Sequence, residues 1–352
     1  MPGRKILLIQ TAFIGDVVLT TPAIRAIKHH FPDDELSVLI KPESLGILAN
    51  HPDLHQVLVI DKKGRHKGPR GMAHLIRQIR EQRFDLLLSP HQSHRSALIA
   101  WRSKIPMRIG YKGSGFARLA WKRQLIRDPG KAEIERLLDF VDQALGTNSA
   151  SLSRQPELHI DPGEQQKVRA LCTELGVHRP VLIAPSSVWA TKRWTTGGFA
   201  ELCRLITSEL RQPVLLIGSP SDEAIAANII LLLEKLYPPA VRAMVHNICG
   251  RTSLAGLYAL MQSSSMLISN DSAPVHFGCA AGIPVVAIFG ATTPSLGYAP
   301  ITANSRIAER TDLACRPCGT HGAERCPRKH FECMRGLEAE SVMQAVRDLW
   351  PG

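Results

Sequence analysis

Residues Met266–Pro294, MLISNDSAPVHFGCAAGIPVVAIFGATTP, are typical of a strand, a tight polar turn, a short helix and a second strand. The apolar residues 266–268 end at Ser269–Ser272, where Asn, Asp and Ser favour turns and helix starts. Pro274 suits the first turn of a helix, and the apolar run 285–289 predicts a buried strand. The stretch therefore predicts one βαβ unit of a parallel sheet. Ligands of such sheets lie at the carboxyl ends of the strands, although a well-capped turn without a ligand fits equally well.

Strand-like and helix-like segments alternate along most of the 352 residues, which is typical of a parallel α/β fold. In the first half we expect strands at 5–10, 36–40, 57–60, 84–88 and 108–111, and helices at 17–30, 72–82 and 133–145. In the second half we expect strands at 181–184, 214–217 and 246–249 besides the opening stretch, and helices at 165–175, 199–210, 223–236, 254–261 and 339–349.

The alternation fades over residues 149–162, which are rich in Ser, Pro and Asp. We therefore predict two Rossmann-like domains that face a cleft, spanning 1–158 and 164–335, followed by a C-terminal helix within 336–352.

Composition narrows the range of partners. The net charge of +12 favours a phosphorylated substrate, anionic lipid or nucleic acid. Only 5% of the residues are aromatic and no recognition motif is visible, so we expect no nucleic acid. The apolar runs are too short to span a bilayer, and the N-terminus MPGRKILLIQTAF fits a first strand better than a signal peptide. These features predict a cytoplasmic protein.

The first chemical motif is Gly15–Asp16, directly after the first strand. No G-x-G-x-x-G sequence is present there, so this half is not expected to hold a dinucleotide in the usual way. Asp16 is either a helix N-cap or a general base at the edge of the sheet. The helix N-terminus is expected to lower its pKa and keep it ionised.

The second motif is the loop at 184–194, which contains Ser186, Ser187, Lys192 and Arg193. Hydroxyl groups and two cations suit a diphosphate, with Lys192 as a point charge and Arg193 as a planar fork. A solvated loop is the alternative, although tryptophans on both sides of the Lys-Arg pair argue against it.

The loop after the next strand, 218–223, ends in the acidic pair Asp222 and Glu223. These carboxylates can accept hydrogen bonds from ribose hydroxyls. An N-cap followed by an acidic first turn explains them equally well.

Three motifs, GDVVLTTPA at 15–23, KRW at 192–194 and the stretch 266–294, together resemble glycosyltransferase family 9, the lipopolysaccharide heptosyltransferases. The resemblance covers nearly the whole chain in order and spacing. It implies a GT-B arrangement and inverting transfer of heptose from ADP-L-glycero-D-manno-heptose to the lipid A–inner core acceptor, without a cofactor for catalysis. Another nucleotide-sugar enzyme, such as an epimerase, and a non-catalytic nucleotide-sugar or glycolipid-binding protein are the alternatives.

The resemblance also assigns site residues. Asp16 matches the family's presumed base, and Lys192 matches a lysine that contacts the diphosphate. The family's Asp-Ser/Thr-Gly turn matches Asp271, Ser272 and Ala273, and its histidine matches His276. Alanine at 273 replaces the usual glycine, and its Cβ keeps a phosphate farther from the backbone. With Ser186, Ser187, Arg193 and Glu223 these residues form the expected donor site, although His276 also fits a satisfied core histidine.

Four cysteines cluster near the C-terminus at Cys315, Cys318, Cys326 and Cys333. Four such ligands can hold a structural zinc, but the spacing is irregular and free thiols are the alternative interpretation. A similar tail occurs in heptosyltransferase II sequences, so the resemblance favours the second-heptose type.

The basic stretch 62–70 lies in the predicted acceptor half. We expect Lys62, Lys63 and Arg65 to contact phosphate or carboxylate groups of the acceptor, and the stretch to support peripheral contact with an anionic membrane. A mobile, solvated loop is the plain alternative.

Overall fold

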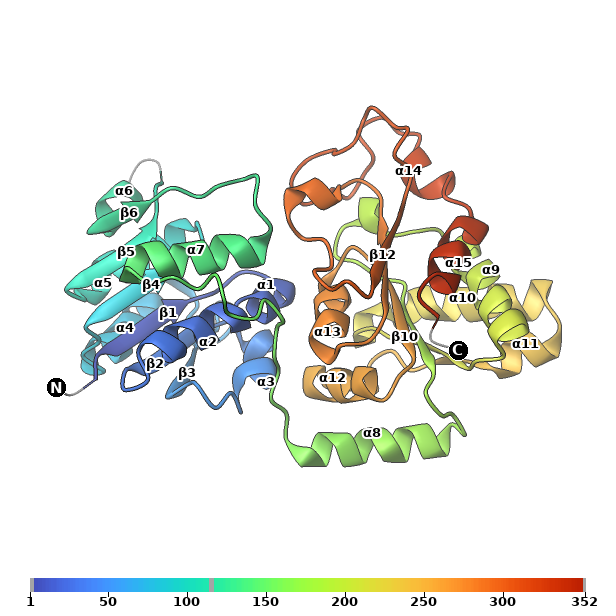
Figure 1. Cartoon of the computed structure of the whole chain (residues 1–352), viewed down its shortest axis with the longest axis horizontal. Coiled ribbons are helices and arrows are strands. Elements are labelled where there is room, and N and C mark those ends of the chain that lie inside the picture. Colours follow the sequence, from blue (N-terminus) through green and yellow to red (C-terminus); the bar gives the residue numbers. More distant parts are fainter. Residues whose placement is uncertain (1–2, 114–116, 351–352) are drawn as a thin grey trace. The chain divides into compact units, whose positions relative to one another are not determined.

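The computed structural model describes residues 3–113 and 117–350. The chain divides into two compact units, residues 1–160 and 161–352 (Figure 1). Each unit is built on a parallel six-stranded sheet with helices on both faces, which confirms the predicted α/β class and the two Rossmann-like halves. Within the described residues, no helix has both the length and the apolar character needed to cross a membrane.

The first unit has the strand order β3-β2-β1-β4-β5-β6. Its strands are Lys5–Ile9 (β1), Glu35–Ile40 (β2), Gln56–Val59 (β3), Leu86–Ser89 (β4), Met107–Tyr111 (β5) and Arg123–Leu125 (β6). Its helices are Ile14–Leu19 (α1), Thr21–His30 (α2), Leu45–Leu48 (α3), Gly68–Glu81 (α4), His94–Ser103 (α5), Ala117–Ala120 (α6) and Glu133–Leu145 (α7), with a 3-10 turn at Pro42–Ser44 (η1). Helices α2 and α7 pack together on one face, and α4 and α5 pack on the other (Figure 1).

The second unit has the strand order β12-β11-β10-β7-β8-β9. Its strands are Val181–Ala184 (β7), Val214–Leu216 (β8), Val245–Asn247 (β9), Met266–Asn270 (β10), Val285–Phe289 (β11) and Ser305–Glu309 (β12). Its helices are Pro162–Glu174 (α8), Thr196–Leu205 (α9), Glu223–Leu236 (α10), Pro239–Ala243 (α11), Leu254–Gln262 (α12), Ala273–Ala281 (α13), Glu332–Arg335 (α14) and Ala339–Arg347 (α15). Short 3-10 helices lie at Ala190–Lys192 (η2), Pro220–Asp222 (η4) and Pro294–Leu296 (η5), and a π-helix at Ile206–Leu210 (η3) directly follows α9.

The C-terminal helix α15 belongs to the core of the second unit. It packs on α9, β11 and β12, and Val342, Met343 and Val346 are fully buried there. Helices α9, α10 and α15 lie on one face of this sheet, and α12 and α13 lie on the other (Figure 1).

The expected helix at 17–30 is wrong in one respect, because the structure divides it into α1 and α2 at Thr20. Pro22 stands in the first turn of α2 and has no N–H to continue the ladder from α1. The division places α1 as a short helix of its own at the carboxyl end of β1.

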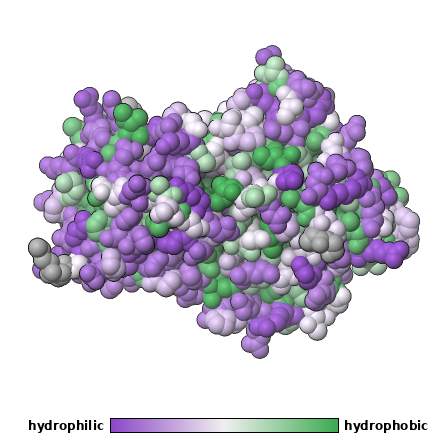
Figure 2. Space-filling model, in the orientation of Figure 1, coloured by the Kyte–Doolittle hydropathy of each residue, from purple (hydrophilic) through white to green (hydrophobic). Residues whose placement is uncertain are grey.

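Strands β4, β7, β10 and β11 are buried along their whole length, because helices cover both faces of each sheet. On the face shown in Figure 2, hydrophilic side chains predominate and apolar ones are scattered. Polar residues are buried at the carboxyl ends of the central strands, as at Asn270 and Asp271, and there the candidate site begins.

Candidate functional site

In the first unit the candidate site begins with Asp16, in the first turn of α1. Its carboxylate accepts a hydrogen bond from the backbone N–H of Phe13 at 3.0 Å. Asp16 is therefore not the N-cap residue itself, but it satisfies one of the free N–H groups at the start of the helix. Its carbonyl oxygen accepts from the Thr20 hydroxyl at 2.7 Å, which fixes the far end of the same turn.

The pKa of Asp16 is raised to about 6, mainly by burial and then by the negative charge of Glu133. Backbone hydrogen bonds and Lys41 lower the pKa, but by less. The predicted lowering is thus wrong in direction, because removal of the carboxylate from water outweighs the helix N-terminus. A base with a pKa just below neutral is still mostly ionised at pH 7 and can accept a proton effectively.

Positive groups lie at the neighbouring strand ends, and one of them, Lys41, lowers the pKa of Asp16. Lys41 follows β2, Lys62 follows β3, and Arg95 lies in the first turn of α5 after β4. Burial lowers the pKa of Lys62, and the charges of Arg95 and Lys41 lower it further, so the three cations lie within electrostatic reach of one another. Sequence reasoning missed Lys41 and Arg95, because only the sheet order brings them next to Lys62.

His91 belongs to the same group. Its Nδ1 lies 3.3 Å from the Thr11 hydroxyl. Burial, followed by the charges of Lys62 and Lys41, lowers its pKa to about 4. The ring is therefore neutral at physiological pH and adds a polar group without adding charge.

The predicted basic stretch is a bonded turn around Asp61. The Asp61 carboxylate accepts from the backbone N–H groups of Lys63, Gly64 and Arg65 at 3.1, 2.8 and 3.1 Å. These bonds give the loop a defined shape, typical of an Asx turn. Lys62 is half-buried and faces the cations described above, whereas Lys63 and Arg65 are exposed.

In the second unit the predicted residues Lys192 and Asp271 form an ion pair. The Lys192 Nζ lies 2.6 Å from the Asp271 carboxylate, and both side chains are largely buried, with exposed fractions of 14% and 7%. The Thr292 hydroxyl donates to the same carboxylate at 2.6 Å. Lys192 follows β7, Asp271 follows β10 and Thr292 follows β11, so three adjacent strand ends build this pair.

A buried amide joins the loops on which this pair stands. Asn270 donates from Nδ2 to the Pro185 carbonyl at 2.8 Å and accepts from the Trp194 N–H at 3.0 Å. The Trp194 ring is buried as well, and its indole N–H donates to the Leu337 carbonyl at 3.0 Å. The KRW motif is therefore fixed on both sides of Lys192.

The N-terminus of α13 has no side-chain cap. Ser272 occupies the N-cap position, but its hydroxyl donates to the Asn270 carbonyl at 3.2 Å and the Ser186 carbonyl at 3.5 Å. Ala273 is the first residue of the helix, so a Cβ stands at its start. Pro274 has no N–H, and the Val275 N–H donates to the Ser272 carbonyl at 3.1 Å, so an anion at this helix start would meet the Ala273 N–H and the helix dipole.

His276 lies in the second turn of α13 and is buried. Burial lowers its pKa to about 4, while Asp271 raises it and Lys192 lowers it. The ring is therefore neutral, and these charge interactions place it near the Lys192–Asp271 pair.

The other predicted donor residues differ in what they contact. The Ser186 hydroxyl donates to Asp222 at 2.5 Å, which joins the loops after β7 and β8. Arg193 donates to the Ser187 carbonyl at 2.7 Å, so its guanidinium stabilises its own loop and is not free to bind a phosphate through two parallel hydrogen bonds. Glu223 is exposed at the first residue of α10.

The four clustered cysteines do not form a metal centre. All are free thiols, and no group of three or more His, Cys, Asp or Glu side chains in 3–113 and 117–350 is arranged to hold a metal ion. The Cys318 thiol donates to the Cys315 carbonyl at 3.3 Å, and the Cys315 sulfur lies 4.0 Å from His330 Nε2. The zinc interpretation is therefore not supported.

Comparison with known proteins identifies relatives of the whole chain. The model of "Glycosyltransferase family 9 (heptosyltransferase)" matches residues 72–326. Lipopolysaccharide heptosyltransferase 3 of Escherichia coli is 27% identical over 288 residues, which cover 80% of this chain and 82% of that protein.

Two solved structures share the fold. A glycosyl transferase family 9 protein from Veillonella parvula superposes with a TM-score of 0.85 at 21% identity, covering 98% of this chain and 97% of the other. The ADP-heptose lipopolysaccharide heptosyltransferase II of E. coli superposes with a TM-score of 0.76 at 21% identity, covering 98% of each chain.

Proposed function

The chain belongs to glycosyltransferase family 9, and from that premise we propose that it transfers a heptose from an ADP-heptose donor to the inner core of a lipopolysaccharide. The observation that carries the proposal is the Lys192–Asp271–Thr292 group beside the uncapped start of α13. A buried cation and the dipole of a helix that starts at an adjacent strand end are suited to a diphosphate. Lipopolysaccharide heptosyltransferases are among the relatives of this chain.

We assign the donor to the second unit. Lys192 and the Ala273 N–H at the start of α13 would contact the diphosphate, on which negative charge grows as the bond to the sugar breaks. Groups already in place for that charge stabilise the transition state more than the ground state. Asp271 and Thr292 hold Lys192 in position, and His276 stays neutral beside them.

We assign the acceptor to the first unit. Asp16 would take the proton of the acceptor hydroxyl as its oxygen bonds to the anomeric carbon and the bond to the diphosphate breaks, which inverts the configuration there. Lys41, Lys62 and Arg95 would bind a phosphate or carboxylate of the acceptor. Exposed Lys63 and Arg65 would favour peripheral contact with an anionic membrane.

The proposal is tested with purified protein, ADP-heptose and a heptose-accepting inner-core acceptor, using mass spectrometry to detect the gain of one heptose. Asp16→Asn is the informative variant, since the amide oxygen can still accept from Phe13 N–H. Asp161→Asn is the matched control, because Asp161 caps the exposed start of α8.

We expect transfer by the wild type and Asp161→Asn, and loss of at least about 100-fold in kcat for folded Asp16→Asn. Full activity of Asp16→Asn would remove Asp16 from its role. Donor turnover without acceptor would favour an epimerase or hydrolase, and donor binding without turnover would favour a binding protein.

A further inference from the structure

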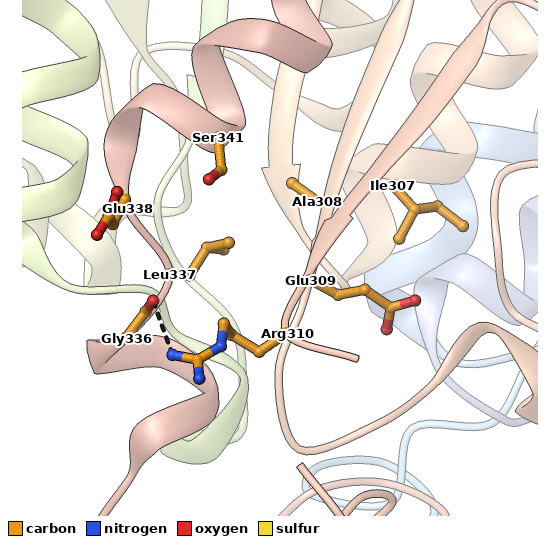
Figure 3. Close-up of a pocket in the computed structure, with 8 residues that line it drawn as sticks. All are labelled: Ile307, Ala308, Glu309, Arg310, Gly336, Leu337, Glu338 and Ser341. Atoms are coloured by element: carbon orange, nitrogen blue, oxygen red, sulfur yellow. Dashed lines mark hydrogen bonds between the residues drawn. The ribbon is translucent and has the colours of Figure 1, made fainter. Parts of the chain in front are cut away.

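Residues 315–323 form a segment, here called the strap, that crosses the carboxyl ends of β11 and β12. Arg316 anchors it, with a side chain only 4% exposed. The guanidinium donates to the Thr292 carbonyl at 2.9 Å and pairs with Glu309 at 2.5 Å, and it also contacts the Gly290 and Arg310 carbonyls. In Figure 3 the Glu309 side chain points away from the cavity of about 390 Å³ beside β12. Glu309 is one of the residues that line this cavity, whereas Arg316 is not, so the ion pair lies on the side of Glu309 away from the cavity.

The other end of the strap is bonded to the loop that carries Lys192. The Thr191 N–H and hydroxyl donate to the Ala323 carbonyl at 3.0 and 2.8 Å. In return, the Ala323 N–H donates to the Thr191 hydroxyl at 2.7 Å. Thr191 is the residue directly before Lys192. Its side chain thus makes two of the three hydrogen bonds that join it to the strap.

The strap also touches Lys192 itself. Gly322 has a φ of +85°, and a Cβ added there would lie 3.2 Å from the Lys192 Cγ and 3.2 Å from the Thr191 hydroxyl oxygen. Contacts of 3.2 Å are tighter than ordinary van der Waals packing, so a side chain at this position would push the lysine stem. Glycine therefore allows the backbone to lie directly against Lys192.

The strap reaches Asp271 through a second route. The Cys318 N–H donates to the Ala291 carbonyl at 2.7 Å, and Arg316 holds the next residue, Thr292, by its carbonyl. The Thr292 hydroxyl in turn bonds Asp271. Both members of the Lys192–Asp271 pair are thus supported from the same segment of chain.

We propose that the strap sets the position of Lys192 and Asp271 and thereby the affinity of the second unit for the diphosphate of its donor. Thr191, Arg316 and Gly322 act as positioning residues. The inference rests on the proposed function, since it takes Lys192 as the diphosphate contact. A strap that only completed the core would change stability and leave the affinity for a diphosphate unchanged.

The first test measures ADP binding by calorimetry, with melting temperature recorded for each variant. Thr191→Val keeps the shape but loses both side-chain hydrogen bonds, whereas Thr191→Ser keeps the hydroxyl. We expect Thr191→Val to weaken ADP binding about 5- to 10-fold, the loss typical of one to two hydrogen bonds, and Thr191→Ser to restore it. In the transferase assay KM for the donor is expected to rise more than kcat falls.

Two glycines of the strap provide a matched pair. Gly322→Ala and Gly319→Ala both place a Cβ on a residue with positive φ, +85° and +143°. The new Cβ meets Lys192 at position 322, but it meets nothing within 4 Å at position 319. We expect both variants to lose some thermal stability and only Gly322→Ala to weaken ADP binding.

The ADP affinity of Lys192→Met distinguishes the positioning role of the strap from the proposed contact between Lys192 and the diphosphate. If folded Thr191→Val and Gly322→Ala bind ADP as the wild type does while Lys192→Met binds weakly, the positioning role is refuted and the diphosphate contact stands. If Lys192→Met binds ADP as the wild type does, the assignment of Lys192 fails, and the inference about the strap fails with it.

Discussion

The raised pKa of Asp16 makes a quantitative prediction about pH. With a pKa of about 6, the carboxylate is about 90% ionised at pH 7 and about 10% ionised at pH 5. If Asp16 is the base, kcat/KM for the acceptor should fall about tenfold over those two pH units. An unshifted aspartate with a pKa near 3.8 would lose less than about a tenth of its ionised form over the same range.

The assay is initial-rate transfer at several acceptor concentrations from pH 4.5 to 8.5, in buffers of constant ionic strength. Circular dichroism at each pH checks that the protein stays folded. His91 and His276 do not confound the profile, because burial lowers both pKa values to about 4 and both rings stay neutral above pH 5. A flat kcat/KM down to pH 5 in folded protein would refute the reasoning.

The raised pKa of Asp16 also predicts how the stability of the fold changes with pH. The folded state keeps the Asp16 proton up to about pH 6, whereas the unfolded chain releases it near 3.8. Stability from this group is therefore present at low pH and declines as pH rises through that window. Asp16→Asn cannot ionise, so its melting temperature relative to wild type should be higher at pH 8 than at pH 4. A difference that does not depend on pH would contradict the burial of this carboxylate.

Three further predictions concern the second unit. Lys192→Met should weaken ADP binding at least about tenfold by calorimetry and lower the melting temperature, since it leaves the buried Asp271 carboxylate without its cation. Asn270→Ala should cost about 1–3 kcal/mol of unfolding free energy in urea titrations, because it leaves the Trp194 N–H and a buried carbonyl without a partner; an unchanged midpoint would contradict this. At pH 7.5 iodoacetamide should label Cys326 faster than Cys203, scored by peptide mass spectrometry. Burial raises the pKa of Cys326, but hydrogen bonds from the N–H groups of residues 328–331 lower it more, so its net pKa is lowered. Burial raises the pKa of Cys203 to about 12. Equal labelling rates would contradict this prediction.

Buried elements were predicted closely and exposed ones were not. The bounds of β7, β11, α7 and α10 agree with the sequence prediction. A strand that is buried on both faces reads as a continuous apolar run, and a helix that is buried on one face shows apolar residues at helical spacing. Edge strand β12, with the sequence SRIAE, was missed. Its exposed positions are Arg306 and Ile307 and only Ala308 is buried, so no apolar run identifies it.

The site divides in the same way. The loop sequence and the family resemblance predict Lys192 and Asp271 as donor-site residues, and the structure brings the two together as an ion pair; their contact with a donor stays a prediction. Thr191 and Ala323 bond one another across 132 positions of sequence, and no local pattern gives such a pairing. The pKa of Asp16 was predicted in the wrong direction for a related reason. The helix start is visible in the sequence, but the burial that outweighs it is a tertiary property.

The Lys192–Asp271 pair has a consequence for catalysis. A largely buried ion pair contributes little to stability, because the loss of hydration offsets much of the attraction. It does hold Lys192 in one position before the donor arrives, with Thr292 fixing the carboxylate. If the diphosphate binds at Lys192 as we propose, it meets a cation whose side-chain entropy has already been lost, so less of the binding energy is needed for ordering. Because Asp271 stays beside Lys192 and competes for it, the same arrangement would also keep ADP from binding too tightly after the sugar has left.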